Sequence, residues 1–193
     1  MSLFDEINFE KRANNLKLPE NDHKLMAYPL ILKHFSEIED VGRDDIIFIL
    51  ELIRGWSHKE KKYQKNDSGS LDFLVDVFNR VRQDGMLHID EVMDVSVNFN
   101  NKEEASVFYH FINPGLYPIY SKSVEEELDG GADSGTIGKA QFETYLDEGI
   151  KFGLNDYQHN LDSIVSSQLK EAGYNYAVTS VRAMELCLTY GTE

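Results

Sequence analysis

Residues 98–128, with the sequence NFNNKEEASVFYHFINPGLYPIYSKSVEEEL, decide the fold that this chain adopts. Apolar residues recur at helical spacing in its first half and predict a buried helix: Val107, Phe108, Phe111 and Ile112. Pro114-Gly115 ends that helix, and Pro118 keeps Tyr117 extended because proline disfavours helical geometry in the residue before it. The stretch is therefore predicted to contain a turn, a buried helix, a rigid extended link and the start of a second helix.

Polar residues stand at the start of each of these two helices. Asn100 and Asn101 can cap the first helix or adopt the left-handed backbone of a turn. Ser121 or Ser123 can cap the second helix, and the glutamates that follow favour its first turn. Both helices therefore have start signals of their own in the sequence.

Apolar periodicity predicts further helices on both sides of this stretch. They are expected over residues 2–18, from Asp22, from Asp44 or Asp45, over 70–83, from Asp90, over 140–152, from Asp156 to Gly173, and over 177–190. Pro29 is expected to kink or split the helix that begins at Asp22. Residues 46–53 are apolar nearly all round, which is typical of a central core helix. With no convincing strand pair, the fold class is all-α with about 8–10 helices.

Two pieces leave alternatives open. Residues 86–99 alternate apolar and polar side chains as a strand would, yet Ile89, Val92 and Met93 also fit a helix. Residues 129–137 are rich in glycine and form a flexible insert. Residues 1–193 are expected to form one compact helical unit, and a division into two lobes, if there is one, would fall near that insert.

The central motifs resemble the helix-hairpin-helix DNA glycosylase superfamily, and its small bacterial members in particular. In that family a hairpin leads into a buried helix with a His-Phe-x-x-Pro end, which matches His110 to Pro114. An extended Phe/Tyr-Pro-Ile/Val link follows in the family, and Tyr117 to Tyr120 matches it. Residues 181–191, VRAMELCLTYG, look like the closing helix of the small relatives. The resemblance implies a glycosylase-like helical fold around a cleft that binds a base extruded from DNA.

This sequence departs from the family's pattern at its catalytic positions. Asn100-Asn101 stands where the family has a Gly-x-Gly hairpin that approaches a DNA phosphate, and Ser121 stands where it has the catalytic aspartate. A serine cannot supply the negative charge that stabilises an oxocarbenium-like sugar. Lys102 lies near the position of the family's Schiff-base lysine, although alignment on Ala105 would put Glu103 there. Lys102 and Ser121 are thus the candidate catalytic residues.

Another carboxylate would have to replace the missing aspartate if the chain is an enzyme, and the sequence does not decide whether it is one. Glu185 and Asp147 are the candidates, provided that the fold brings either of them to the cleft. The candidate nucleic-acid-binding residues are the hairpin and the possible stacking rings, namely Asn100, Asn101, Lys102, Trp56, Tyr117 and Tyr120. The partner would then be DNA or a nucleotide.

The formal net charge of -15 opposes binding to a polyanion and supports a second hypothesis. The chain could instead be a non-enzymatic, acidic interaction protein that binds a basic protein, or a mimic of nucleic acid. One basic stretch, between Arg54 and Arg82, carries four lysines and also contains the aromatic residues Trp56 and Tyr63. It could be a nucleic-acid footprint or a solvated loop, since residues 57–70 have no apolar periodicity.

Several classes of protein are disfavoured by simple patterns. No apolar run is long enough for a membrane span and no signal-peptide pattern stands at the start, so a cytoplasmic protein without a membrane partner is expected. The six histidines form no zinc-binding spacing and no dinucleotide or phosphate-loop motif occurs, so neither metal nor cofactor is expected. His110 and the single cysteine, Cys187, are expected to pack in the core.

Overall fold

The structure is a computed structural model that describes residues 4, 7–57, 68–86, 91, 99, 102–128, 138–154 and 160–192. The described residues form nine helices and no strand, which confirms the predicted all-α class. These helices are α1 (Phe9–Asn14), α2 (His23–Glu37), α3 (Arg43–Ser57), α4 (Ser68–Asp84), α6 (Lys102–Ile112), α7 (Lys122–Leu128), α8 (Gly138–Leu154), α9 (Leu161–Glu171) and α10 (Ser180–Tyr190).

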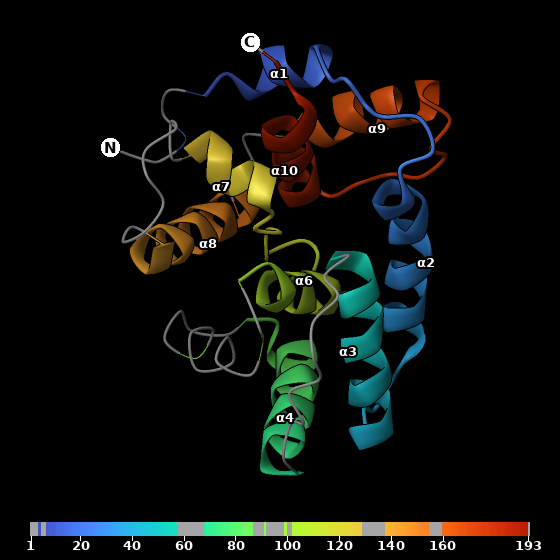
Figure 1. Cartoon of the computed structure of the whole chain (residues 1–193), viewed down its shortest axis with the longest axis vertical. Helices are drawn as coiled ribbons and strands as arrows, with labels where there is room; N and C mark the ends of the chain where they lie inside the picture. The colour runs from blue at the N-terminus through green and yellow to red at the C-terminus, as the bar shows by residue number, and fades with distance from the viewer. Residues whose placement is uncertain are drawn as a thin grey trace.

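The helices pack in two groups, which Figure 1 shows one above the other. Helices α2, α3 and α4 pack around α6 and form what we call the α6 group. Helices α1, α7, α8 and α9 pack around α10 and form the α10 group. Residues 15–22 and 113–121 carry the chain from one group to the other. Because α7 and α8 both pack on α10, the chain stays within the α10 group on either side of residues 129–137.

The second crossing is the extended link that the sequence predicts, and side chains hold its backbone in place. Tyr117 O accepts a hydrogen bond from His110 Nδ1 at 2.7 Å, and Ile119 O accepts one from the Tyr145 hydroxyl at 3.0 Å. Tyr120 N donates to Ser106 Oγ at 2.8 Å. Residues 117–120 are all buried, so these bonds replace the water that an extended backbone would otherwise need.

The start of the link's second helix is capped as predicted. Val124 N donates to Ser121 Oγ at 3.2 Å, and Glu125 N donates to Ser121 O at 3.0 Å, so Ser121 is the N-cap of α7. Gly173, which was expected to close the helix before α10, follows α9 and has a φ of 91°. These local signals are confirmed.

Three predictions about helices are corrected. The first helix spans only Phe9–Asn14: Asn8 is its N-cap, and beyond its end Leu16 forms an isolated antiparallel bridge with Gly191 instead of continuing the helix. Helix α2 runs through Pro29 as one helix, so of the two effects expected of Pro29 the split is wrong. Helix α3 is not buried all round: Ile47 and Phe48 are 40% and 49% exposed, because only one face of α3 packs against its neighbours.

Other helix boundaries shift by a few residues. Helix α4 begins at Ser68 and not at Ser70, α8 extends over Gly138–Leu154, α9 begins at Leu161, and α10 begins at Ser180 after an N-cap at Thr179. Several predictions lie outside the described residues. They concern the turn at Asn100-Asn101, the insert at 129–137 and the lysines between 58 and 67. The choice between strand and helix for residues 86–99 is also outside, because only positions 86, 91 and 99 of that stretch are described.

Candidate functional site

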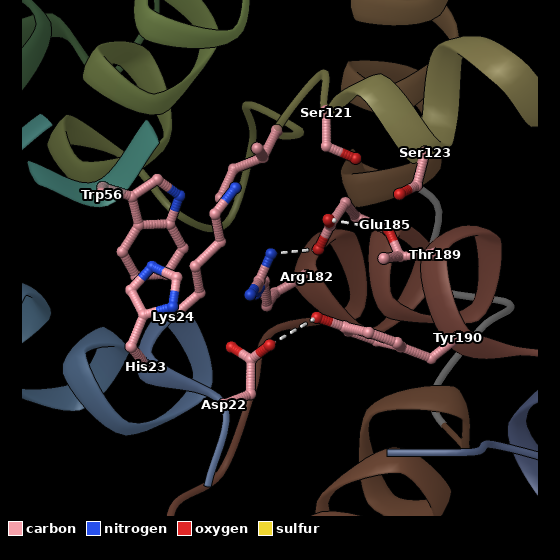
Figure 2. Close-up of a pocket in the computed structure, with 11 residues that line it drawn as sticks. Asp22, His23, Lys24, Trp56, Ser121, Ser123, Arg182, Glu185, Thr189 and Tyr190 are labelled. Carbon is pink, nitrogen blue, oxygen red and sulfur yellow. Dashed lines mark hydrogen bonds and ion pairs between the residues drawn. The ribbon is translucent and has the colours of Figure 1, made fainter. Parts of the chain in front are cut away.

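A cavity of about 220 Å³ opens where the two groups of helices meet. It is lined by Asp22, His23, Lys24, Trp56, Ile119, Ser121, Ser123, Arg182, Glu185, Thr189 and Tyr190. Figure 2 shows Trp56 and His23 on one side, the hydroxyl side chains of Ser121, Ser123 and Thr189 on the other, and Arg182 with Glu185 between them. One wall is therefore aromatic and the opposite wall is polar.

The two crossings of the chain supply two corners of this cavity. Asp22 ends the first crossing and caps α2, since its Oδ1 accepts a hydrogen bond from Leu25 N at 3.0 Å. Ser121 ends the second crossing and caps α7. Tyr190 OH donates to the other Asp22 oxygen at 3.5 Å and so connects α10 to the start of α2. The cavity is thus built at the junctions that hold the two groups together.

Helix α10 contributes a buried ion pair, Arg182–Glu185, one turn apart on the same face. Each residue is 3% exposed, and Arg182 Nη1 donates to Glu185 Oε2. The second carboxylate oxygen of Glu185 accepts a hydrogen bond from Thr189 Oγ1 at 3.1 Å. Among the atoms of the described residues, Arg182 Nε is buried without a hydrogen-bond acceptor. The pair is therefore fixed in position but retains one unused donor.

Aromatic rings hold the guanidinium of Arg182 from the side of the α6 group. Its Cζ lies 4.8 Å from the centre of the Tyr28 ring and 5.7 Å from the centre of the Trp56 ring. A cation over an aromatic face is stabilised by the ring quadrupole, and more so when both are shielded from water. Arg182 thus joins the two groups by an interaction that the sequence alone does not reveal.

Burial changes the proton affinity of the groups around the cavity. Burial raises the pKa of the Glu185 carboxyl above its usual range, although the charge of Arg182 works in the opposite direction. Burial also works against the charge of Arg182, yet Glu185 holds the pKa of that guanidinium above its usual value. The pKa of Tyr190 is raised, by burial first and then by the negative charge of Asp22. A carboxyl with a raised pKa in a cavity is a feature that functional sites share.

Behind the cavity, a chain of hydrogen bonds runs from Tyr28 through His110 to the link. His110 Nδ1 must carry the proton, because its partner Tyr117 O can only accept. His110 Nε2 therefore accepts the hydrogen bond from Tyr28 OH at 2.9 Å. Burial, helped by the charge of Arg182, lowers the pKa of His110 to about 3, so the ring is neutral at ordinary pH. The expected packing role of His110 is thus confirmed.

The structure brings some of the candidate residues together and leaves others apart. Trp56 and Ser121 both line the cavity. Tyr117 and Tyr120 are 0% and 2% exposed and do not line it; their rings pack in the core, Tyr117 on Tyr109 and Tyr120 on Phe142 and Tyr145. The structure thus gives both tyrosines a packing role.

Lys102 stands apart from the cavity lining, with Nζ 5.8 Å from the centre of the Tyr120 ring. Asn100 and Asn101 lie outside the described residues. Of the two carboxylates considered as replacements for the missing aspartate, Glu185 lines the same cavity as Ser121. Asp147 instead pairs with Lys151 at 2.5 Å on the exposed side of α8. Glu185 is thus the carboxylate that the fold brings to the Ser121 position.

Sequence reasoning missed Asp22, Lys24, Arg182 and Tyr190 as residues of the cavity. For Arg182 a signal was available: together with Glu185 it forms an i, i+3 charged pair inside an otherwise apolar helix. Charged residues are almost never buried unless they are paired, so such a pair indicates an interior polar site. Asp22 and Lys24 gave no comparable signal, because polar residues at a helix start are commonplace.

The part of the chain that the structure describes contains neither a cluster of metal-binding side chains nor a membrane-spanning helix. No group of three or more His, Cys, Asp or Glu side chains there could hold a metal ion. None of the helices in those ranges is long and apolar enough to cross a membrane. Cys187 is buried in α10, and burial raises the pKa of its thiol to about 12, which fits the core packing expected of it.

Comparisons with known proteins found no relative of this chain. No protein-family model matches the chain, and no match was found among curated proteins or solved structures.

Proposed function

We propose that the cavity binds a nucleobase or a closely similar planar heterocycle. The observation that carries this proposal is the buried Arg182–Glu185 pair, held in place on the floor of a small cavity with Trp56 on one wall. Such a floor offers fixed acceptors and a donor to the edge of a ring. The His23 ring and the indole of Trp56, which is 3% exposed, form the aromatic side that Figure 2 shows.

The size of the cavity favours a single ring system. Sites for drug-sized ligands usually measure roughly 300–1,000 Å³, so the 220 Å³ found here is small. A cavity of about 150 Å³ can hold benzene. A volume of 220 Å³ lies between these two values and suits a ligand of one ring or two fused rings, such as a pyrimidine or a purine.

The polar groups suit a ring whose edge carries both donors and acceptors. Glu185 can accept from a ring N–H or an amino group, and the guanidinium of Arg182 is a donor group among the same lining residues. The hydroxyls of Ser121, Ser123 and Thr189 can do either. A purely apolar ligand would use none of these donors and acceptors.

The position of the cavity agrees with the resemblance to helix-hairpin-helix DNA glycosylases. Ser121, at the position of the family's catalytic aspartate, lines the cavity, and Glu185 stands among the same lining residues. We therefore propose a glycosylase-like scaffold in which Glu185 takes the place of the missing aspartate. Base binding is the function proposed, and excision of a modified base is the reaction to test alongside it.

The test uses Trp56, the single tryptophan of the chain, as a fluorescent reporter inside the cavity. Titration with free bases is expected to change the Trp56 emission and to give a saturable binding curve. Glu185→Gln is expected to weaken binding at least tenfold, whereas Asp147→Asn, on exposed α8, should leave it unchanged. Absence of a saturable response to any base, in a protein shown to be folded by circular dichroism, would refute the proposal.

Excision is tested with duplexes that carry damaged or modified bases. If the chain is an enzyme, free base is released by the parent protein and release is lost in Glu185→Gln but kept in Asp147→Asn. Lack of release across a broad panel, from a protein that binds bases, would assign the chain to binding alone.

One observation favours a second function, that of an acidic interaction protein. The net charge of -15 would steer a basic protein toward the surface and make association fast and sensitive to salt. Labelled polyarginine and a labelled DNA duplex of equal length discriminate the two functions at low ionic strength. Tight, salt-sensitive binding of polyarginine in a protein that binds no base would support the second function.

A further inference from the structure

We infer that the ligand of this cavity is a free, uncharged base or nucleoside, and that the site excludes nucleotides and bases within a nucleic-acid strand. This inference rests on the proposed base-binding function, defines its ligand class, and predicts that the duplex assay releases no free base. It is carried by the electrostatic surroundings of the cavity, in which the Arg and Lys side chains are paired with carboxylates and the start of one helix is capped by a carboxylate.

Helix N-termini are the first such feature, since their free N–H groups and dipoles bind phosphates. Two helices, α2 and α7, begin at the cavity. Asp22 Oδ1 accepts from Leu25 N at the start of α2, and Ser121 Oγ accepts from Val124 N at the start of α7. One N–H at each start is therefore taken by a side chain that also lines the cavity, and the cap of α2 places a negative charge where a phosphate would bind.

Cationic side chains are the second feature, and those lining the cavity are paired with carboxylates. Arg182 pairs with Glu185 inside the cavity. Lys24 Nζ lies 2.8 Å from Glu103 Oε1, which belongs to α6. Because each positive charge is already balanced, a phosphate would gain little attraction in exchange for the water that it must lose.

Asp22 makes the entrance unfavourable for an anion. Its carboxylate accepts hydrogen bonds from Leu25 N and Tyr190 OH and, among the described residues, makes no ion pair with a cationic side chain. Figure 2 places Asp22 at one edge of the cavity, across from the serines. A phosphate attached to a bound nucleoside would approach this charge and, beyond it, a chain whose net charge is -15.

A neutral ligand meets none of these obstacles. Its ring edge can bond the Arg182–Glu185 floor and the hydroxyls, and it leaves all of the ion pairs intact. Its binding should also be nearly independent of salt, because no counterions are released when a neutral molecule binds. Salt dependence therefore separates this ligand class from nucleic acid.

The experiment titrates the Trp56 emission of the intact protein with four series of ligands: free bases, the corresponding nucleosides, their 5′-monophosphates, and single-stranded oligonucleotides. We expect the base or nucleoside to bind at least tenfold more tightly than its monophosphate, with an affinity that changes less than twofold between low and moderate salt. Tighter binding of the monophosphate or of the oligonucleotide would overturn this inference and leave base binding standing. Lack of response to all four series would instead refute base binding itself.

A variant of Asp22 tests the electrostatic cause. Asp22→Asn keeps a good helix cap, because asparagine and aspartate cap equally well, but removes the charge. The ratio of base affinity to monophosphate affinity is expected to fall at least about twofold, which is the Coulomb effect of one charge at roughly 8 Å in water. Asp162→Asn, on α9 and not part of the cavity lining, is the matched control and should leave the ratio unchanged. An unchanged ratio in Asp22→Asn would contradict the inference.

Discussion

His110 should make the protein lose stability as the pH falls from neutral toward 3. The ring is fully buried, donates from Nδ1 to Tyr117 O and accepts at Nε2 from Tyr28 OH. Protonation would place a second donor against a hydroxyl that already donates, next to the charge of Arg182. The folded protein therefore resists protonation, and the pKa of His110 is lowered from 6.5 to about 3.

The sign and size of the effect follow from linkage. Between pH 6.5 and 3 the unfolded chain binds a proton at His110 and the folded protein does not, so acid favours unfolding. The stabilisation is complete above pH 6.5 and is lost as the pH falls toward 3. At about 1.4 kcal/mol per pH unit, the loss is about 2 kcal/mol by pH 5 and about 5 kcal/mol in total. The raised pKa of Glu185 has the opposite effect on stability: the folded protein holds the Glu185 proton more tightly than the unfolded chain does, so this contribution to stability is lost as the pH rises.

Urea denaturation at a series of pH values measures this effect as the difference between the parent and His110→Gln. Glutamine can hydrogen-bond but does not titrate, so the variant should be less stable at pH 7.5 and should lose stability less steeply toward pH 5. Val77→Ala is the control: it removes buried methyl groups in α4 and should lower stability equally at every pH. Parallel curves for the parent and His110→Gln would refute the neutral, buried state assigned to this ring.

Two further pairs of variants test the link and its surroundings by urea denaturation. Ile119→Ala should destabilise the protein by about 2–4 kcal/mol through the cavity that it leaves, since Ile119 is 1% exposed. Ser121→Ala should cost about 1 kcal/mol through the lost cap of α7. An Ile119→Ala protein as stable as the parent would mean that the link is exposed. Gly149→Ala should destabilise, because a Cβ there would overlap the Pro118 ring. Gly55→Ala, with open space around it, should instead stabilise by about 0.5–1 kcal/mol, and equal effects at both glycines would contradict the packing of α8 on the link.

The sequence by itself determined the features that depend on near neighbours along the chain. Apolar spacing is a property of a few helical turns, so the buried helix at Lys102–Ile112 and the all-α class could be predicted. The extended geometry of Tyr117 follows from the adjacent Pro118, and the Ser121 cap follows from the residues just after it. Local predictions failed where a distant segment intervened, as at Leu16, whose bridge to Gly191 ends the first helix region.

Only the tertiary structure decided which polar residues form a site. Asp22, Ser121 and Arg182 lie in three distant parts of the sequence and meet because α6 and α10 each organise a separate group of helices. The charged pair Arg182–Glu185 is visible in the sequence, but its burial and its aromatic neighbours are not. The physical reason is range: helix propensity, capping and proline geometry act over a few residues, whereas a cavity depends on how side chains far apart in the chain pack against one another.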